Sequence, residues 1–305
     1  MAAFPTSPST DDTHSYGGTT FKWNDTGWEI VPGAVNLVAS GGGTEVTDSG
    51  YKYHTFTSSG TLVVTTPGLV DALIIGGGGA GNSGYAAAGG GAGGLNYIPS
   101  LYLPSGNVAI VVGAGGSADG DATLAAPGTL SSINGEHFGY GGGPGASNSV
   151  WGASLTTWTM GGGSGGGCGA LSCFPAGAGV PGQGNSGGGG KYGYQGGGGG
   201  GAGSIGQSAD GRGGDGGTGL NTYSAWATAT STGDNGYYCS GGGGTLLNND
   251  GGDASDGGGT DSARGQATNA AANLGGGGGA GGGESPFDDM GANGGSGLVI
   301  VRYAV

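Results

Sequence analysis

Residues 196–201 read GGGGGG, and runs of this kind, repeated between residues 76 and 297, decide the fold. Glycine accounts for 88 of the 305 residues, against a usual share of about 7%. Glycine loses more backbone freedom on folding than any other residue, so an ordered block of this composition needs many compensating contacts. The other main runs lie at residues 76–79, 89–91, 141–143, 161–167 (with one Ser inside), 187–190, 241–244, 275–279 and 281–283.

The consecutive glycines favour one ordered state over two others. Collagen needs glycine at every third position, and calcium-binding β-helices need a fixed period with regular Asp; neither pattern is present. The polyglycine II helix is extended and left-handed, has three residues per turn, and leaves every N–H and C=O group free to bond to a neighbour. A Cβ would hold two such backbones apart. We therefore predict a polyglycine II bundle with variable loops over residues 76–297; a flexible linker is the alternative.

Apolar strands frame the glycine block on both sides. Residues 69–75 run straight into the first glycines, and residues 298–303 read LVIVRY. We expect these two strands to be neighbours in one sheet, which makes the block a long excursion between them. The predicted organisation is a β module over 1–38 with a hairpin turn at 24–27, framing strands over 39–75, the bundle including a hairpin at 95–112, and a closing strand over 298–305. No convincing amphipathic helix is present, so the fold class is mainly β with a glycine bundle and almost no α-helix.

Composition and charge exclude several functions. The net charge is -14, and six Lys and Arg residues are too few for nucleic acid or an anionic membrane surface. No apolar run reaches the ~20 residues of a membrane span, and the N-terminus lacks the features of a secretory signal, so synthesis in the cytoplasm is expected. Cys168, Cys173 and Cys239 fit no zinc spacing. We expect idle or buried thiols, with a Cys168–Cys173 disulfide as the alternative, and no cofactor.

Residues that could carry catalysis are sparse. No Ser/His/Asp arrangement stands out, and loose glycine motifs mean nothing at this composition. Glu284 with Asp288 and Asp289 could supply paired acids for glycoside cleavage, but a solvated loop is the better interpretation. We therefore expect no enzyme activity, no catalytic residue and no metal site.

The segments between glycine runs predict a recognition surface. If successive runs cross the bundle in alternating directions, the inserts at 147–160, 191–195, 220–240 and 260–274 share one end, and mostly short returns occupy the other. Aromatic residues on that end could stack on sugars or meet a protein receptor; the alternative is that they only cap the bundle. The predicted receptor-binding residues are Trp151, Trp158, Tyr192, Tyr194, Tyr223, Trp226, Tyr237 and Tyr238.

Several motifs resemble structural proteins of tailed bacteriophages. Residues 21–28, FKWNDTGW, are similar to an N-terminal module of tail-fibre-like proteins. Residues 50–61 (GYKYHTFTSSGT), 70–79 (VDALIIGGGG) and 294–303 (GGSGLVIVRY) look like the glycine-rich domain of phage tail fibres. The resemblance also extends to fibre-tip adhesins with polyglycine II helices, although those lack N-terminal β modules of this kind.

The resemblance implies a virion protein, most readily a tail-fibre or adhesin component. It would attach to other virion or tail proteins through residues 1–38 and bind a host cell-surface receptor without catalysis. A homotrimer is an expectation by analogy with fibres. The alternative is a non-adhesive decoration or filament-forming protein whose glycine block is scaffold; an ice-binding bundle is a third class.

Overall fold

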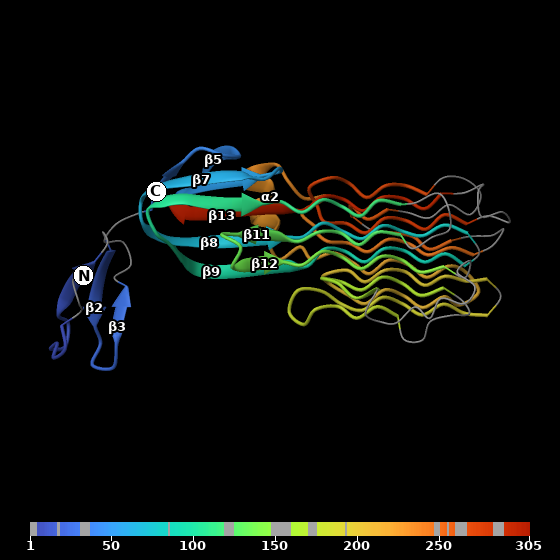
Figure 1. Ribbon diagram of the computed structural model, residues 1–305, viewed down its shortest axis with the longest axis horizontal. Coiled ribbons are helices and arrows are strands. Elements are labelled where there is room, and N and C mark those ends of the chain that lie inside the picture. Colours follow the sequence, from blue (N-terminus) through green and yellow to red (C-terminus); the bar gives the residue numbers. More distant parts are fainter. Residues whose placement is uncertain are drawn as a thin grey trace.

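The computed structural model arranges the chain along one long axis (Figure 1). A small N-terminal sheet is followed by two larger sheets, and a set of extended segments continues away from them. The structure describes residues 5–16, 19–30, 37–84, 86–118, 125–147, 160–169, 176–192, 194–246, 251–254, 256–259, 267–282 and 290–305.

The N-terminal sheet contains three antiparallel strands, β1 (Thr13–Tyr16), β2 (Thr19–Trp23) and β3 (Trp28–Ile30). Trp23 faces Trp28 across the hairpin, with their rings 5.7 Å apart. The Asn24 Oδ1 atom accepts hydrogen bonds from the N–H groups of Thr26 (3.0 Å) and Gly27 (2.8 Å), which fixes the turn. The hairpin turn predicted at 24–27 is confirmed, whereas β1 occupies residues that the sequence did not predict as a strand of their own.

Two five-stranded sheets form a β-sandwich. The first has the order β12-β11-β10-β7-β4 and the second β5-β6-β13-β8-β9. The strands are β4 (Val38–Ser40), β5 (Thr44–Asp48), β6 (Tyr51–Phe56), β7 (Gly60–Thr66), β8 (Gly68–Ile75), β9 (Leu95–Leu103), β10 (Gly106–Val111), β11 (Ser131–Ile133), β12 (His137–Gly139) and β13 (Leu298–Ala304). The last strand, β13, pairs antiparallel with β8, Leu298 opposite Ile75, so the predicted pairing of the two framing strands is confirmed.

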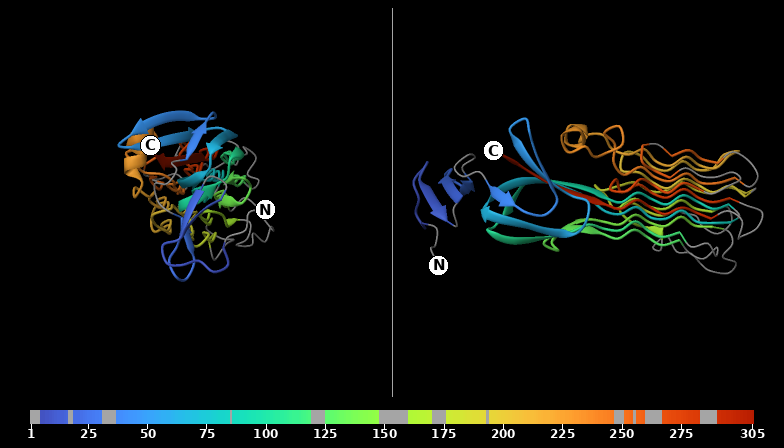
Figure 2. Two further views of the ribbon diagram at one scale, coloured as in Figure 1. Left: turned by 90° about the vertical axis from the view of Figure 1, so that its left-hand side faces the viewer. Right: turned by 90° about the horizontal axis from the view of Figure 1, so that it is seen from above.

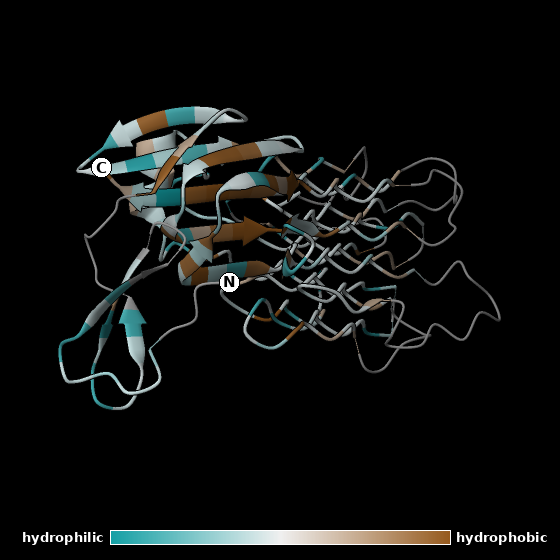
Figure 3. Ribbon diagram, turned by 60° about the vertical axis from the view of Figure 1, so that its left-hand side comes forward, coloured by the Kyte–Doolittle hydropathy of each residue, from teal (hydrophilic) through white to brown (hydrophobic). Residues whose placement is uncertain are grey.

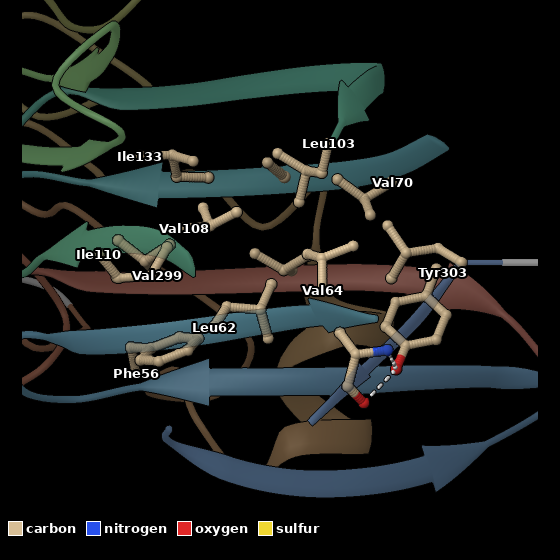
Figure 4. Close-up of a cluster of buried hydrophobic side chains, with 14 of the residues drawn as sticks. Phe56, Leu62, Val64, Val70, Leu103, Val108, Ile110, Ile133, Val299 and Tyr303 are labelled. Atoms are coloured by element: carbon tan, nitrogen blue, oxygen red, sulfur yellow. Dashed lines mark hydrogen bonds between the residues drawn. The ribbon is translucent and has the colours of Figure 1, made fainter. Parts of the chain in front are cut away.

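The space between the two sheets is filled by apolar side chains from both (Figure 4). Leu62 and Val64 come from β7, and Val299 and Val301 from β13; all four are at most 2% exposed. Apolar residues concentrate on these strands, while the glycine segments beyond them are nearly neutral in hydropathy (Figure 3). At one edge of this core, Tyr303 donates a hydrogen bond from its hydroxyl to the carbonyl of Ala39 (3.2 Å). The sandwich is therefore the apolar core to which the bundle is attached.

Residues 95–112 form two strands but not the predicted hairpin. β9 pairs with β8 in the second sheet, and β10 pairs with β7 in the first. Leu103 at the end of β9 and Val108 and Ile110 in β10 all point into the core between the sheets. The chain crosses from one sheet to the other here because the apolar faces of both strands are buried by facing each other rather than by pairing edge to edge.

The strands of the sandwich pass directly into the glycine bundle. β8 ends at Ile75 and continues as Gly76, and β9 begins at Leu95 after Gly94. The Gly76 N–H donates to the Gly94 carbonyl (3.0 Å), which prolongs the β8–β9 pairing by one step. Figures 1 and 2 show from two directions that the extended segments keep the axis of the strands. The sandwich therefore sets the starting positions of the bundle.

Within the bundle, hydrogen bonds follow a period of three residues, as segment 88–94 shows. Ala88, Gly91 and Gly94 donate to Ala146, Gly143 and Tyr140; Gly89 and Ala92 donate to Gly197 and Gly200; Gly90 and Gly93 donate to Gly278 and Gly275, all at 2.7–3.1 Å. The same segment accepts bonds from residues in 76–82 and 164–167 and from Gly242. Three donor directions and three acceptor directions surround one segment with six neighbours. This is the bonding of the predicted polyglycine II bundle, in which backbone groups satisfy one another across segments.

Close approach between backbones explains why these positions hold glycine. A Cβ on Gly89 would lie 2.0 Å from the carbonyl oxygen of Gly242, and one on Gly93 would lie 2.0 Å from that of Gly76. Neither glycine has a φ in the left-handed region, so the requirement is space and not an unusual backbone conformation. Methyl groups are accommodated at some sites, since Ala88 and Ala92 are fully buried in the same segment.

The expectation of buried or idle thiols is confirmed for Cys239 but not for Cys168. Cys168 is disulfide-bonded, and Cys239 is a free, buried thiol. Cys173 lies outside the described residues. Burial raises the pKa of the Cys239 thiol, which keeps it protonated and inert.

Candidate functional site

The bundle has two ends with different surroundings. At its sheet end, residues 76, 94 and 297 join the strands of the sandwich. The opposite end, here the free end, lies beyond residues 87 and 245, which bond to each other (2.9 Å). The N-terminal sheet lies on the far side of the sandwich from the free end (Figure 1). Any side chain held in a turn at the free end is therefore displayed away from the N-terminal sheet.

Tyr192 and Tyr194 lie in a turn at the free end. Lys191 and Gln195 close this turn through backbone hydrogen bonds of 3.0 and 3.3 Å, and Gly196 then bonds to Thr245 (2.8 Å). Tyr192 is 81% exposed, more than any other large hydrophobic residue that the structure describes. The Lys191 ammonium forms an ion pair with Asp210, and the hydrogen bond from Lys191 lowers the pKa of the Asp210 carboxyl. The turn thus presents an aromatic ring beside a charged pair.

The insert at 220–240 lies instead at the sheet end, against the second sheet. It closes on itself through reciprocal backbone bonds between Leu220 and Tyr238 (2.9 and 3.1 Å) and contains the short helix α2 (Ser224–Thr230). Trp226 on this helix is 5% exposed and packs edge-on against Tyr53 of β6, 5.9 Å between ring centroids. Tyr238 is fully buried, with its hydroxyl 2.6 Å from that of Thr232. These side chains form a second apolar core that covers the outer face of the sheet.

The prediction of one aromatic recognition face is therefore wrong. Tyr192 and Tyr194 lie at the free end, whereas Tyr223, Trp226, Tyr237 and Tyr238 lie at the sheet end. Trp226 and Tyr238 are core residues, and Tyr223 and Tyr237 are half-buried. Trp151 and Trp158, the remaining predicted residues, lie outside the described part of the chain.

The prediction that alternate inserts share one end failed because the chain also reverses inside glycine-rich stretches. Segment 160–168 turns near Gly163, which bonds to Gly141, and then runs on to Cys168 beside Gly188. Another reversal lies at 180–184, where Gly182 has a φ of +81°. The reversal near Gly163 carries no insert and was not counted. Alternating the inserts between the two ends therefore placed some inserts at the wrong end. The Pro181–Gly182 pair is a sequence signal that could have predicted the reversal at 180–184.

A pocket of about 340 Å³ lies at the junction of bundle and sandwich. One side is formed by β9 (Asn96 and Tyr97), and the other by the 180–184 turn and the start of the 220–240 insert. The rings of Tyr97 and Tyr223 lie 5.1 Å apart with a 38° tilt, and both are half-buried. The full lining is Leu95, Asn96, Tyr97, Gly182, Gln183, Gly184, Asn185, Ala202, Leu220 and Tyr223.

Hydrogen bonds hold the amide side chains of this pocket in place. Gln183 donates to the carbonyl of Phe138 (2.9 Å) and accepts from the Tyr140 N–H (3.1 Å). Asn185 donates to the carbonyls of Gly201 (2.9 Å) and Ala202 (3.0 Å). Sequence reasoning missed this pocket because its residues come from four separate segments, and no spacing along the chain brings them together.

The electrostatics of the pocket favour neutral groups. None of the lining residues is Lys, Arg, His, Asp or Glu. Burial raises the pKa of Tyr97, and the nearby Asp71 carboxylate raises it further, while burial also raises the pKa of Tyr223. Both hydroxyls therefore stay protonated at neutral pH and can donate hydrogen bonds.

Other kinds of site are not apparent in the described part of the chain. No group of three or more His, Cys, Asp or Glu side chains there could hold a metal ion. Glu284, Asp288 and Asp289, the paired-acid candidates, lie outside it. No helix among the described residues has the length and apolar character needed to cross a membrane.

No curated protein matches the chain. Residues 56–304 match the profile of a family described as a glycine-rich domain. The matched region begins at the end of β6 and closes with the last residue of β13, so it contains the bundle and most of the strands that frame it. With most of its length matched, the chain belongs to this glycine-rich domain family.

Proposed function

We propose that the chain is a structural protein of a tailed-phage virion, a tail-fibre or adhesin component that binds a host cell-surface glycan or protein. The resemblance of the framing motifs to phage tail fibres supports this origin, and the N-terminal sheet would join other virion or tail proteins. The observation that carries the recognition role is the position of Tyr192, 81% exposed in a closed turn at the free end.

Rigidity is what the bundle would add to recognition. The segment that leads out of the turn, 196–201, is bonded on all sides through backbone groups, so the turn that carries Tyr192 starts from a fixed position. The exposed ring could stack on a sugar or enter a protein pocket, and aromatic residues are frequent anchors of such contacts. The Lys191–Asp210 ion pair beside it could form hydrogen bonds with polar groups of the same partner.

A second candidate is a non-adhesive decoration or filament-forming protein of the virion. It is favoured by the burial of Trp226 and Tyr238, because these aromatic residues cap the bundle and are not free to bind. Under this proposal the sandwich and bundle are scaffold, and the turns at the free end have no partner on the host.

Whole-cell binding separates the two candidates. Purified full-length protein would be mixed with a panel of bacterial cells and with their purified surface glycans, and the bound fraction measured by sedimentation. Adhesion predicts that at least one strain retains the protein and that Tyr192→Ala lowers retention at least tenfold. Tyr102→Ala, an exposed tyrosine of β9 in the sandwich, is the matched control and should bind normally. Equal retention of Tyr192→Ala and the unaltered protein would contradict recognition through this turn, and retention by no strain would favour the scaffold.

A further inference from the structure

We infer that the junction pocket binds a neutral saccharide of one or two rings, at a site separate from the free end. The pocket combines three properties that such a ligand requires: flat aromatic surface, fixed hydrogen-bonding groups and no charge. Its volume of about 340 Å³ lies near the lower limit for small-molecule sites, which suits a ligand of this size.

The aromatic surface comes from Tyr97 and Tyr223. A sugar ring has an apolar C–H face that packs on an aromatic ring while its hydroxyls stay at the edge. Trp226 packs edge-on against both tyrosine rings, with ring centroids 6.0 Å apart for Tyr97 and 6.2 Å apart for Tyr223. This support fixes both rings before a ligand arrives, so little side-chain freedom is lost on binding.

Two amides supply fixed acceptors. The Nδ2 group of Asn185 is used twice within the fold, and that of Asn96 donates to the Phe138 carbonyl (3.0 Å). Neither Oδ1 atom receives a hydrogen bond from any described residue, and neither is among the buried side-chain atoms that lack a partner. These two oxygens can accept bonds from sugar hydroxyls, and the Tyr223 hydroxyl can donate.

Charge sets the ligand class. A carboxylate or phosphate would lie in a pocket whose lining has no Lys or Arg, and the Asp71 carboxylate, which Arg302 engages at 2.7 Å, lies near the lining residue Tyr97. An ammonium ligand would find no carboxylate in the lining. A buried charge without a partner is costly, so a polyhydroxylated neutral ligand is favoured.

Saturation-transfer NMR with the full-length protein tests this site. The probes are glucose, galactose, mannose, N-acetylglucosamine and their disaccharides, with glucuronate as the charged counterpart of glucose. We expect at least one neutral probe to bind, Tyr223→Ala to weaken its Kd at least tenfold, and glucuronate to bind at least tenfold more weakly than glucose if glucose is bound. Tyr102→Ala on the same strand as Tyr97 is the control and should leave the Kd unchanged.

Two further results decide the proposal. Tyr223→Leu keeps an apolar side chain against Trp226 but removes the flat ring, so it should fold normally, by its Tm, and still lose at least tenfold in affinity. Binding of no neutral probe at 10 mM, on the order of the weakest useful affinity, would overturn the inference, as would a Kd unaffected by Tyr223→Leu. Tyr192→Ala should bind the sugar normally, so this site and recognition at the free end can fail independently.

Discussion

Replacing one interior glycine by alanine should destabilise the bundle far more than a methyl group ordinarily does. The Cβ of Gly89→Ala would lie 2.0 Å from the Gly242 carbonyl oxygen and 2.8 Å from that of Gly243, both of them backbone atoms. Ordinary contact begins near 3.4 Å, so the segment at 242–245 must move away by about 1.4 Å. No flexible side chain is present to absorb that shift.

The cost follows from the hydrogen bonds that this shift would break. Gly242 donates to Gly90 and Thr245 donates to Ala87, each at 2.9 Å, and both bonds join the two segments that must separate. Leaving a buried backbone group unpaired costs about 1–3 kcal/mol, and overpacking adds about 1–3 kcal/mol. With both bonds broken at about 1 kcal/mol or more each, and overpacking added, the sum is at least about 3 kcal/mol, a large part of the 5–15 kcal/mol that is typical for a whole domain. The fall in Tm should be on the order of 10 °C.

Two other glycines separate the steric effect from the general effect of losing a glycine. Gly60→Ala places its Cβ 3.6 Å from the Phe56 ring, an ordinary contact, and should change stability by less than about 0.5 kcal/mol. Gly182→Ala meets nothing within 4 Å but must adopt a φ of +81°, which costs about 1–2 kcal/mol. Thermal and denaturant unfolding should show the largest loss of stability for Gly89→Ala, a smaller loss for Gly182→Ala and the smallest for Gly60→Ala. Equal Tm values for Gly89→Ala and Gly60→Ala would refute the close packing of the bundle.

Three further predictions address the core, acid stability and order of the bundle. Trp226→Ala should cost about 3–5 kcal/mol in denaturant unfolding because it empties the core beneath α2, whereas Tyr192→Ala should stay within about 0.5 kcal/mol; similar losses would contradict their different burial. Burial lowers the pKa of His54, so the unfolded chain takes up a proton at this residue at higher pH than the folded chain does. The Tm should therefore fall as the pH drops below about 6.5, and His54→Gln should lack this decline. Amide hydrogen exchange should be slow across 89–94 and 197–200 and faster at Tyr192; exchange at free-peptide rates across the glycine segments would rule out an ordered bundle.

The sequence predicted those parts of the fold that depend on local pattern. Apolar runs at 69–75 and 298–303 identified β8 and β13 and their pairing, because a strand buried on both faces needs continuous apolar residues. Uninterrupted glycine predicted the polyglycine II bundle, because only residues without Cβ allow backbones to approach so closely. The sequence did not predict that β9 and β10 belong to different sheets. A hairpin and a crossing between sheets leave the same alternation and the same turn residues in the sequence.

The candidate sites were harder to predict because they depend on where each reversal lies. Tyr192 and Trp226 look alike in the sequence, as aromatic residues between glycine runs, yet one is 81% exposed and the other 5%. The difference comes from α2 and the bonds between Leu220 and Tyr238, which fold the insert back onto the outer face of the second sheet. A seven-residue helix without a side-chain N-cap leaves little local signal, and its existence depends on that packing.

The two ends of the bundle are consequently free to vary to different degrees. Interior segments are joined mainly by backbone groups, and exchanging Tyr192 leaves the backbone bonds of 196–201 in place. At the sheet end, Trp226 and Tyr238 are part of the apolar core, so the 220–240 insert cannot change without loss of stability. A protein built in this way can alter the surface it presents at one end while the other preserves the fold. Under the adhesion proposal, this separation would let the turn that carries Tyr192 change while the sandwich and the 220–240 insert keep the fold.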